Sequence, residues 1–309
     1  MNDIIENDTL KWLFISGKGG VGKTTLSSSI AIELTKHKKN VLLVSLDPAH
    51  STSDFFQQTF STDPILVNGY SNLYCIEYNF KNNINTSILN QNYNNELKHL
   101  TTLFETIPGI DEALGYISLM KFASNLDYSI IIFDTAPTGH TLKLLSYPSL
   151  LKESYHKLIH SNIGIMFKHV LGKFIMNNDK SIEDKLCLFS DKVDDINNKL
   201  TDTNYTQFVC VTLPEYLSVY EMERFIQKVL YYNIDCKTII VNKIIEEDNH
   251  DNCIYCSNQY INQEKYLDVI DDLYSEDFNI IYIPRLINVE IKNVDIFTSY
   301  LYNRVDYLD

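Results

Sequence analysis

Residues 12–25 read WLFISGKGGVGKTT, an apolar run that leads into a glycine-rich loop, and no other segment constrains the fold as strongly. The spacing Gly17-x4-Gly22-Lys23-Thr24 is that of a P-loop, whose backbone N–H groups close around phosphate oxygens at a helix N-terminus. We expect Lys23 to reach the β- and γ-phosphates and Thr24 to hold Mg²⁺. The predicted nucleotide-binding residues of this segment are Gly17, Lys18, Gly19, Gly20, Val21, Gly22, Lys23, Thr24 and Thr25.

Two other interpretations of this loop remain. The spacing Gly17-x-Gly19-x-x-Gly22 also satisfies a dinucleotide-binding fingerprint, but that fingerprint gives no reason for Lys-Thr after the last glycine. A plain glycine-rich turn is the other. Lys18 bears on the choice, because a lysine at this position marks the deviant P-loop class, whose members resemble one another in working as nucleotide-sandwich dimers. Lys18 could then act on the phosphates of a facing subunit, although a solvated loop lysine is the simpler alternative.

Composition narrows the possible partners. The chain has 309 residues, 45% of them hydrophobic, and a formal net charge of −14. Such an acidic chain does not obviously supply the basic face that nucleic acid requires, so no nucleic-acid partner is expected. The acidic N-terminal residues do not resemble a secretory signal, and no apolar run reaches transmembrane length, which favours a cytoplasmic location.

Two further strands are predicted to end in aspartate. The run 41–46 precedes Asp47, which could orient or deprotonate a water facing the γ-phosphate, although Asp-Pro is also a common turn opener. The run 129–134 ends in Asp134, as a Walker B strand does. The hydroxyl-rich segment 135–141 after it is suited to sensing a γ-phosphate. Strands alternating with helices predict an α/β fold, a mostly parallel sheet flanked by helices.

A helical insertion is predicted within this single 1–309 domain. Residues 150–203 are too long for a simple crossover, and the helices expected at 97–125 would complete the same subdomain. Two apolar stripes recur there at helical spacing, one at 163–175 and one at 182–200. Such stripes are usually core, but on an insertion they can also line a binding groove.

The motifs GKGGVGKTT, DPAHSTSD, PGIDEA and DTAPTGHT, in this order, resemble the arsenite-pump ATPase family, and within it the cytosolic branch that guides tail-anchored membrane proteins to the endoplasmic reticulum. FVCVTLPEYLSVYEMERF and IIVNK extend the resemblance over most of the chain. It implies a homodimer, an ATPase activity, tail-anchored clients and a membrane receptor. It also implies that Glu215 contacts nucleotide and that Asn242 reads adenine. The chain departs from the family at Ser16, where a glycine is usual, and has few methionines in the insertion.

Cys253-x-x-Cys256 is expected in an acidic loop and indicates a clip around one metal ion or a redox pair. Two thiolates are half of a tetrahedral zinc site, and His250 is a local candidate for a further ligand. The family resemblance implies instead a Zn²⁺ shared by four cysteines of two subunits. Two other functions remain open. An iron–sulfur scaffold would be brown when purified, and a subunit of an arsenite-pump-type ATPase would turn over faster with arsenite.

Overall fold

The computed structural model describes residues 2–47, 51–78, 119–120, 123–124, 126–138, 182–246, 253–286 and 294–302. The chain divides into two compact units. The first comprises Met1–Tyr78, Asp127–Leu142 and Thr201–Asp309, and the second comprises Asn79–Leu126 and Lys143–Leu200. No helix among the described residues has the length and apolar character needed to cross a membrane.

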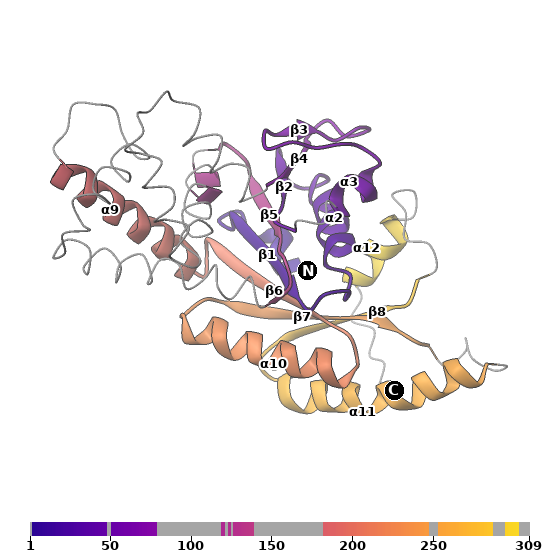
Figure 1. The fold of residues 1–309 in the computed structure, drawn as a ribbon. Coiled ribbons are helices and arrows are strands. Elements are labelled where there is room, and N and C mark those ends of the chain that lie inside the picture. The colour runs from indigo at the N-terminus through magenta and orange to yellow at the C-terminus, as the bar shows by residue number, and fades with distance from the viewer. Residues whose placement is uncertain are drawn as a thin grey trace, which may run out of the picture. The chain divides into compact units, whose positions relative to one another are not determined.

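The first unit is built on an eight-stranded sheet with the order β3-β4-β2-β5-β1-β6-β7-β8 (Figure 1). Every neighbouring pair is parallel except β3 and β4, which confirms the predicted mostly parallel sheet. The central strands are continuous apolar runs because both of their faces are covered. The strands are β1 (Trp12–Gly17), β2 (Val41–Ser45), β3 (Ile65–Leu66), β4 (Leu73–Glu77), β5 (Ile130–Asp134), β6 (Thr206–Thr212), β7 (Cys236–Ile244) and β8 (Asn279–Pro284).

Helices cover the two faces of the sheet. Leu13 and Ile15 of β1 belong to one apolar cluster with Leu26 and Ile30 of α2. Phe14 points to the other face, where its ring stacks on Phe208, and Phe208 in turn lies against Phe225 of α10. The helices of this unit are α1 (Asn2–Glu6), α2 (Lys23–Leu34), α3 (Ser51–Phe56), α10 (Tyr216–Tyr231), α11 (Ile254–Tyr274) and α12 (Val294–Tyr302).

One described helix, α9 (Ile182–Thr201), lies almost entirely in the second unit. In its second half Val193, Ile196 and Leu200 are at most 2% exposed. The predicted stripe of this helix is therefore internal wherever its side chains are described. The stripe at 163–175 and most of the helices expected at 97–125 lie outside the described residues.

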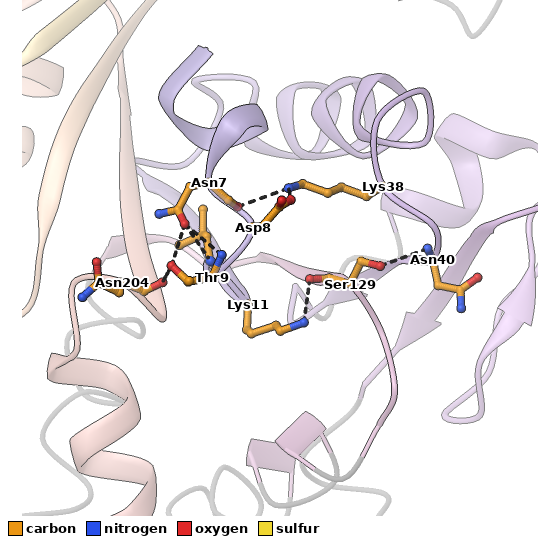
Figure 2. A network of polar contacts seen from close by, with 9 residues as sticks. Asn7, Asp8, Thr9, Lys11, Lys38, Asn40, Ser129 and Asn204 are labelled. Atoms are coloured by element: carbon orange, nitrogen blue, oxygen red, sulfur yellow. Dashed lines mark hydrogen bonds and ion pairs between the residues drawn. The ribbon is translucent and has the colours of Figure 1, made fainter.

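A network of hydrogen bonds and an ion pair joins residues at the amino edge of the sheet (Figure 2). The buried Lys38 ammonium donates to Asp8 Oδ1 at 2.8 Å and to the Asn7 carbonyl at 3.2 Å. Lys11 donates to the Ser129 carbonyl at 3.4 Å, which ties the start of β1 to the residue before β5. The pKa of the exposed Asp8 is lowered by its hydrogen bond to Lys38. These contacts hold together the loops at the amino edge of the sheet. The candidate site lies at the opposite, carboxyl edge.

Candidate nucleotide-binding site

The glycine-rich loop joins the end of β1 to α2 at the carboxyl edge of the sheet, where open α/β folds bind ligands. Gly20 and Gly22 have φ angles of 83° and 99°, which favour residues without a Cβ. A Cβ at Gly17 would lie 2.2 Å from the Val211 carbonyl oxygen, so β6 also requires glycine there. The sequence thus folds into a loop whose amides can face an anion at the start of a 12-residue helix.

Lys23 is the first residue of α2, directly after the loop, and only 6% of the residue is exposed. Its ammonium donates to the Lys18 carbonyl at 3.0 Å. Burial lowers the pKa of Lys23, while the carboxylates of Asp134 and Asp47 act in the opposite direction. Both carboxylates therefore lie close enough to Lys23 to favour its charged form. Their roles at a triphosphate remain predictions.

Thr24 and Asp134 form the part of the site that fits Mg²⁺. The Thr24 hydroxyl donates to Asp134 Oδ2 at 2.7 Å. Asp134 Oδ1 is buried and has no hydrogen-bond partner, and burial raises the pKa of this carboxyl to about 7. A buried carboxylate oxygen without a partner beside a hydroxyl is a suitable donor set for Mg²⁺, which takes oxygen ligands. Bound there with nucleotide, Mg²⁺ would neutralise phosphate charge.

Three polar residues form one row on the same face of the sheet. Register pairs Asp134 of β5 with Ser45 of β2, and Ser45 with Glu77 of β4. The Glu77 carboxylate accepts the Ser53 N–H at 2.8 Å, which ties α3 to the row. Asp47 follows Ser45 by two residues and is half-buried, and the Leu46 N–H donates to the Asp134 carbonyl at 2.8 Å. The backbone before Asp47 is thereby held beside Asp134.

The segment after Asp134 begins against the loop. The Thr135 hydroxyl donates to the Ile15 carbonyl at 2.9 Å and is 3.1 Å from Ser16 Oγ. The Ser16 side chain therefore adds a contact between β1 and this segment. Gly19 faces the ring of Pro137, because a Cβ at Gly19 would lie 3.8 Å from it. Residues 139–141 lie outside the described part of the chain.

The other predicted nucleotide contacts are placed differently from one another. Asn242 is buried, and its amide nitrogen donates to the Val21 carbonyl at 2.8 Å. Glu215 is the exposed N-cap residue of α10. Lys18 is half-buried within the loop, and Thr25 is half-buried at the start of α2. Adenine reading by Asn242, the Glu215 contact and a trans role of Lys18 remain predictions.

The two predicted zinc ligands lie at the start of α11 and not, as expected, in a loop. Cys253 is its exposed N-cap residue, and the Cys256 N–H donates to Cys253 Sγ at 3.5 Å. This hydrogen bond lowers the pKa of Cys253. No cluster of three or more potential metal ligands occurs among the described residues, which do not include His250.

Sequence reasoning missed two contacts of the site. The Lys243 ammonium donates to the Gly20 carbonyl at 2.8 Å, whereas the motif IIVNK predicts a nucleotide contact only for Asn242. The Thr138 hydroxyl donates to the Glu221 carboxylate at 3.4 Å, which links the segment after Asp134 to α10. A lysine near the carboxyl end of a strand was the available signal for the first contact. No pattern in the sequence announced the second.

The loop, the buried lysine and the acid at the end of β5 meet at one edge of a mostly parallel sheet, and together they define a P-loop nucleoside triphosphatase. Comparison with known families makes the assignment specific, because the family described as anion-transporting ATPase matches residues 10–302. The chain belongs to this family and is an ATPase.

Curated relatives match over almost the whole chain. An "ATPase ASNA1 homolog" of Plasmodium falciparum is 39% identical over 97% of this chain and 88% of its own length. An "ATPase GET3" of Mycosarcoma maydis is 38% identical over 96% of this chain and 90% of its own. A protein of the same name from Rhodotorula glutinis is 38% identical over 96% and 88%. The similarity therefore covers the nucleotide site and the second unit alike.

Proposed function

We propose that this ATPase binds the transmembrane helix of tail-anchored proteins in the cytosol and delivers them to the endoplasmic reticulum membrane. The observation that carries the proposal is the similarity to ATPases named GET3 over 96% of this chain. A similarity confined to nucleotide chemistry would concentrate in the P-loop and the sheet. Its extent supports a shared use of the second unit, and the motifs resemble the branch that guides tail-anchored proteins.

Chain connectivity supports coupling between ATP and client. The segment after Asp134 runs to Leu142, and the second unit resumes at Lys143. The first stretch of that unit ends at Leu126, four residues before β5 begins. Along the sequence, β5 and the segment after it therefore lie between the two stretches that form the second unit. We infer that a change in residues 135–141 on hydrolysis alters that unit and releases the client.

Hydrolysis requires a positioned water and stabilised phosphate charge. Asp47 orients the water, because its carboxylate lies at the same edge as Lys23. Lys18 acts on the phosphates of the facing subunit of a homodimer. From its position after Gly17 its stem would have to fold back to reach its own phosphates.

The homodimer is held partly by one Zn²⁺ bound by Cys253 and Cys256 of each subunit. Cys253 is exposed at a helix start, so its thiol is accessible to a second copy. Four thiolates complete the tetrahedral set that structural zinc sites prefer. A site closed within one chain by His250 is the competing arrangement.

The client-binding surface is assigned to the stripe 163–175, within an insertion that we place at residues 150–203. A membrane-spanning helix of about 20 residues is roughly 30 Å long, and one helix of the insertion can shield only part of it. Two such faces in a closed dimer would shield more. Leucine, isoleucine and phenylalanine supply this surface, which has few of the adaptable methionines.

Co-expression with a tail-anchored client tests the proposal. The triple variant Ile163→Asp, Phe167→Asp, Phe174→Asp is expected to abolish client capture and to keep basal ATP hydrolysis. The matched control is Lys168→Glu with Lys173→Glu. These lysines are predicted to lie on the side of the helix away from its apolar face, so this variant should still capture the client. Copurification of the client and steady-state ATPase activity are the two readouts.

Several results would contradict the proposal. Parallel loss of folding and ATPase activity in the triple variant would make those residues core. Turnover stimulated by arsenite without client capture would favour an anion pump subunit. Visible absorbance with bound iron would favour a cluster scaffold.

A further inference from the structure

The end of β7 departs from regular strand geometry beside the phosphate-binding loop. The register of β7 with β8 shifts between Val241 and Ile244. Between them Lys243 has a φ of 61°, a left-handed conformation that is rare for a residue with a Cβ. Such bulges re-aim side chains and occur next to active sites. Here the bulge directs both Asn242 and Lys243 to the loop.

Each of these two side chains holds one loop carbonyl. The Lys243 ammonium donates to the Gly20 carbonyl at 2.8 Å, and the Asn242 amide donates to the Val21 carbonyl at 2.8 Å. The side-chain oxygen Oδ1 of Asn242 accepts the Lys243 N–H at 2.9 Å, so the two residues are also fixed to each other. Gly22 leaves room for this arrangement, since a Cβ there would lie 2.6 Å from Asn242 Nδ2.

Holding a carbonyl also fixes an N–H group. The peptide unit is planar and trans, so the N–H of the next residue points away from the carbonyl oxygen. The bond to the Gly20 carbonyl therefore orients the Val21 N–H, and the bond to the Val21 carbonyl orients the Gly22 N–H. Both amides are turned away from β7, and they are consecutive members of the predicted phosphate cradle.

We propose that Lys243 is a positioning residue for nucleotide, which acts with Asn242 to set two amides of the loop before ATP binds. The left-handed backbone at position 243 supports this role. Glycine would suit that conformation better, so the strained lysine is explained by what its side chain contacts. The proposal depends on nucleotide binding at the P-loop and not on client targeting, and its test involves no client.

The test compares Lys243→Met with Lys237→Met in the full chain. Lys237 is an exposed lysine of the same strand, and its ammonium pairs with Asp235 at 3.0 Å, so the control removes an equal charge from β7. We expect Lys243→Met to raise the Kd for a fluorescent ADP analogue and the KM for ATP about three- to tenfold, the effect of one hydrogen bond, with kcat nearly unchanged. Hydrogen exchange at 17–25 without nucleotide should be faster than in the control.

Lys243→Gly is the second variant, because glycine accepts a φ of 61° and guards against a loss of folding. It should lose affinity as Lys243→Met does while keeping or gaining thermal stability. Affinity equal to that of the Lys237→Met control in either Lys243 variant would overturn the proposal. Reduced affinity with unchanged exchange of the loop amides would also overturn it, because Lys243 would then act through its charge alone.

Discussion

A single oxygen atom explains much of the behaviour expected of the nucleotide site. Asp134 Oδ1 is buried without a partner, whereas Oδ2 accepts the Thr24 hydroxyl. Leaving a buried acceptor unpaired costs free energy, so this oxygen destabilises the nucleotide-free protein. Binding of Mg²⁺ with nucleotide would remove this defect, and the protein should therefore be more stable with its ligand.

Asp134→Asn should reveal this cost as a function of pH. Burial raises the pKa of Asp134 from 3.8 to about 7, so between these values the folded state holds a proton that the unfolded state releases. Stability of the nucleotide-free protein is therefore reduced as pH rises across that interval, by at most about 4 kcal/mol. The neutral variant should melt higher than wild type at pH 8, with a smaller difference at pH 5.

The same variant should lose Mg²⁺-dependent tightening of nucleotide binding. Asp63→Asn is the matched control, since Asp63 is exposed on the same unit. Calorimetric melting at both pH values and nucleotide titration with and without Mg²⁺ measure the two effects. A variant that melts lower than wild type at pH 8 would show that the ionised carboxylate stabilises the empty site.

At the scale of elements, the loop depends on close approach to two strands, and its glycines differ in what they avoid. Gly17→Ala would bring a Cβ to 2.2 Å from a backbone carbonyl of β6, which the neighbouring strands hold in place. Overpacking of this kind costs about 1–3 kcal/mol or more. Gly22→Ala meets the end of a side chain instead, and adds the strain of a φ of 99°. We expect Gly17→Ala to lower Tm more than Gly22→Ala.

Gly69→Ala separates the two effects at Gly22. Gly69 has a φ of 88°, and no atom lies within 4 Å of the point that a Cβ would occupy there, so its variant carries backbone strain without a clash. Nucleotide affinity should fall in Gly22→Ala and stay unchanged in Gly69→Ala, with thermal melting as the second measurement. Equal melting temperatures in Gly17→Ala and Gly69→Ala would contradict the requirement of β6 for glycine.

Elements with strong local signals could be predicted from sequence, and the exceptions have physical reasons. The strand before Asp47 and the strand that ends in Asp134 are apolar runs bounded by polar residues, so the sequence predicts their bounds to within one or two residues. Strand β3 has two residues, too few for any periodicity. The Cys253 pair was assigned to a loop because the acidic residues before it dominate the local pattern. The hydrogen bond from Asn242 to Val21 joins residues 221 positions apart in the sequence, a contact that the spacing within a motif does not encode.

For the whole molecule, the homodimer and its shared zinc ion are predictions that metal analysis can test. Cys253→Ser with Cys256→Ser should remove zinc and weaken the dimer while nucleotide binding persists, because the P-loop joins β1 to α2 whereas the cysteines lie at the start of α11. Wild-type protein should contain about one zinc per two chains, as expected for a four-thiolate site. Elemental analysis and sedimentation measure the two quantities. One zinc per chain, lost in His250→Ala, would show a site closed within a monomer.

Lys18 and Asp47 allow the nucleotide sandwich itself to be tested by complementation. Asp47→Asn alone should hydrolyse ATP roughly 10²- to 10⁴-fold more slowly while still binding it, because the amide keeps the shape but loses the charge that orients water. Lys18→Ala alone should also be impaired if each lysine serves the partner's phosphates.

In a heterodimer of these two variants, the site on the Lys18→Ala chain keeps its own aspartate and receives an intact lysine from its partner. The other site lacks both groups. Random mixing of equal amounts should therefore restore about one quarter of wild-type turnover, because half of the dimers are mixed and each has one complete site. A lysine acting within its own chain would leave every site of the mixed dimer with one defect. Mixed turnover no greater than the mean of the two homodimers would then exclude action across the dimer.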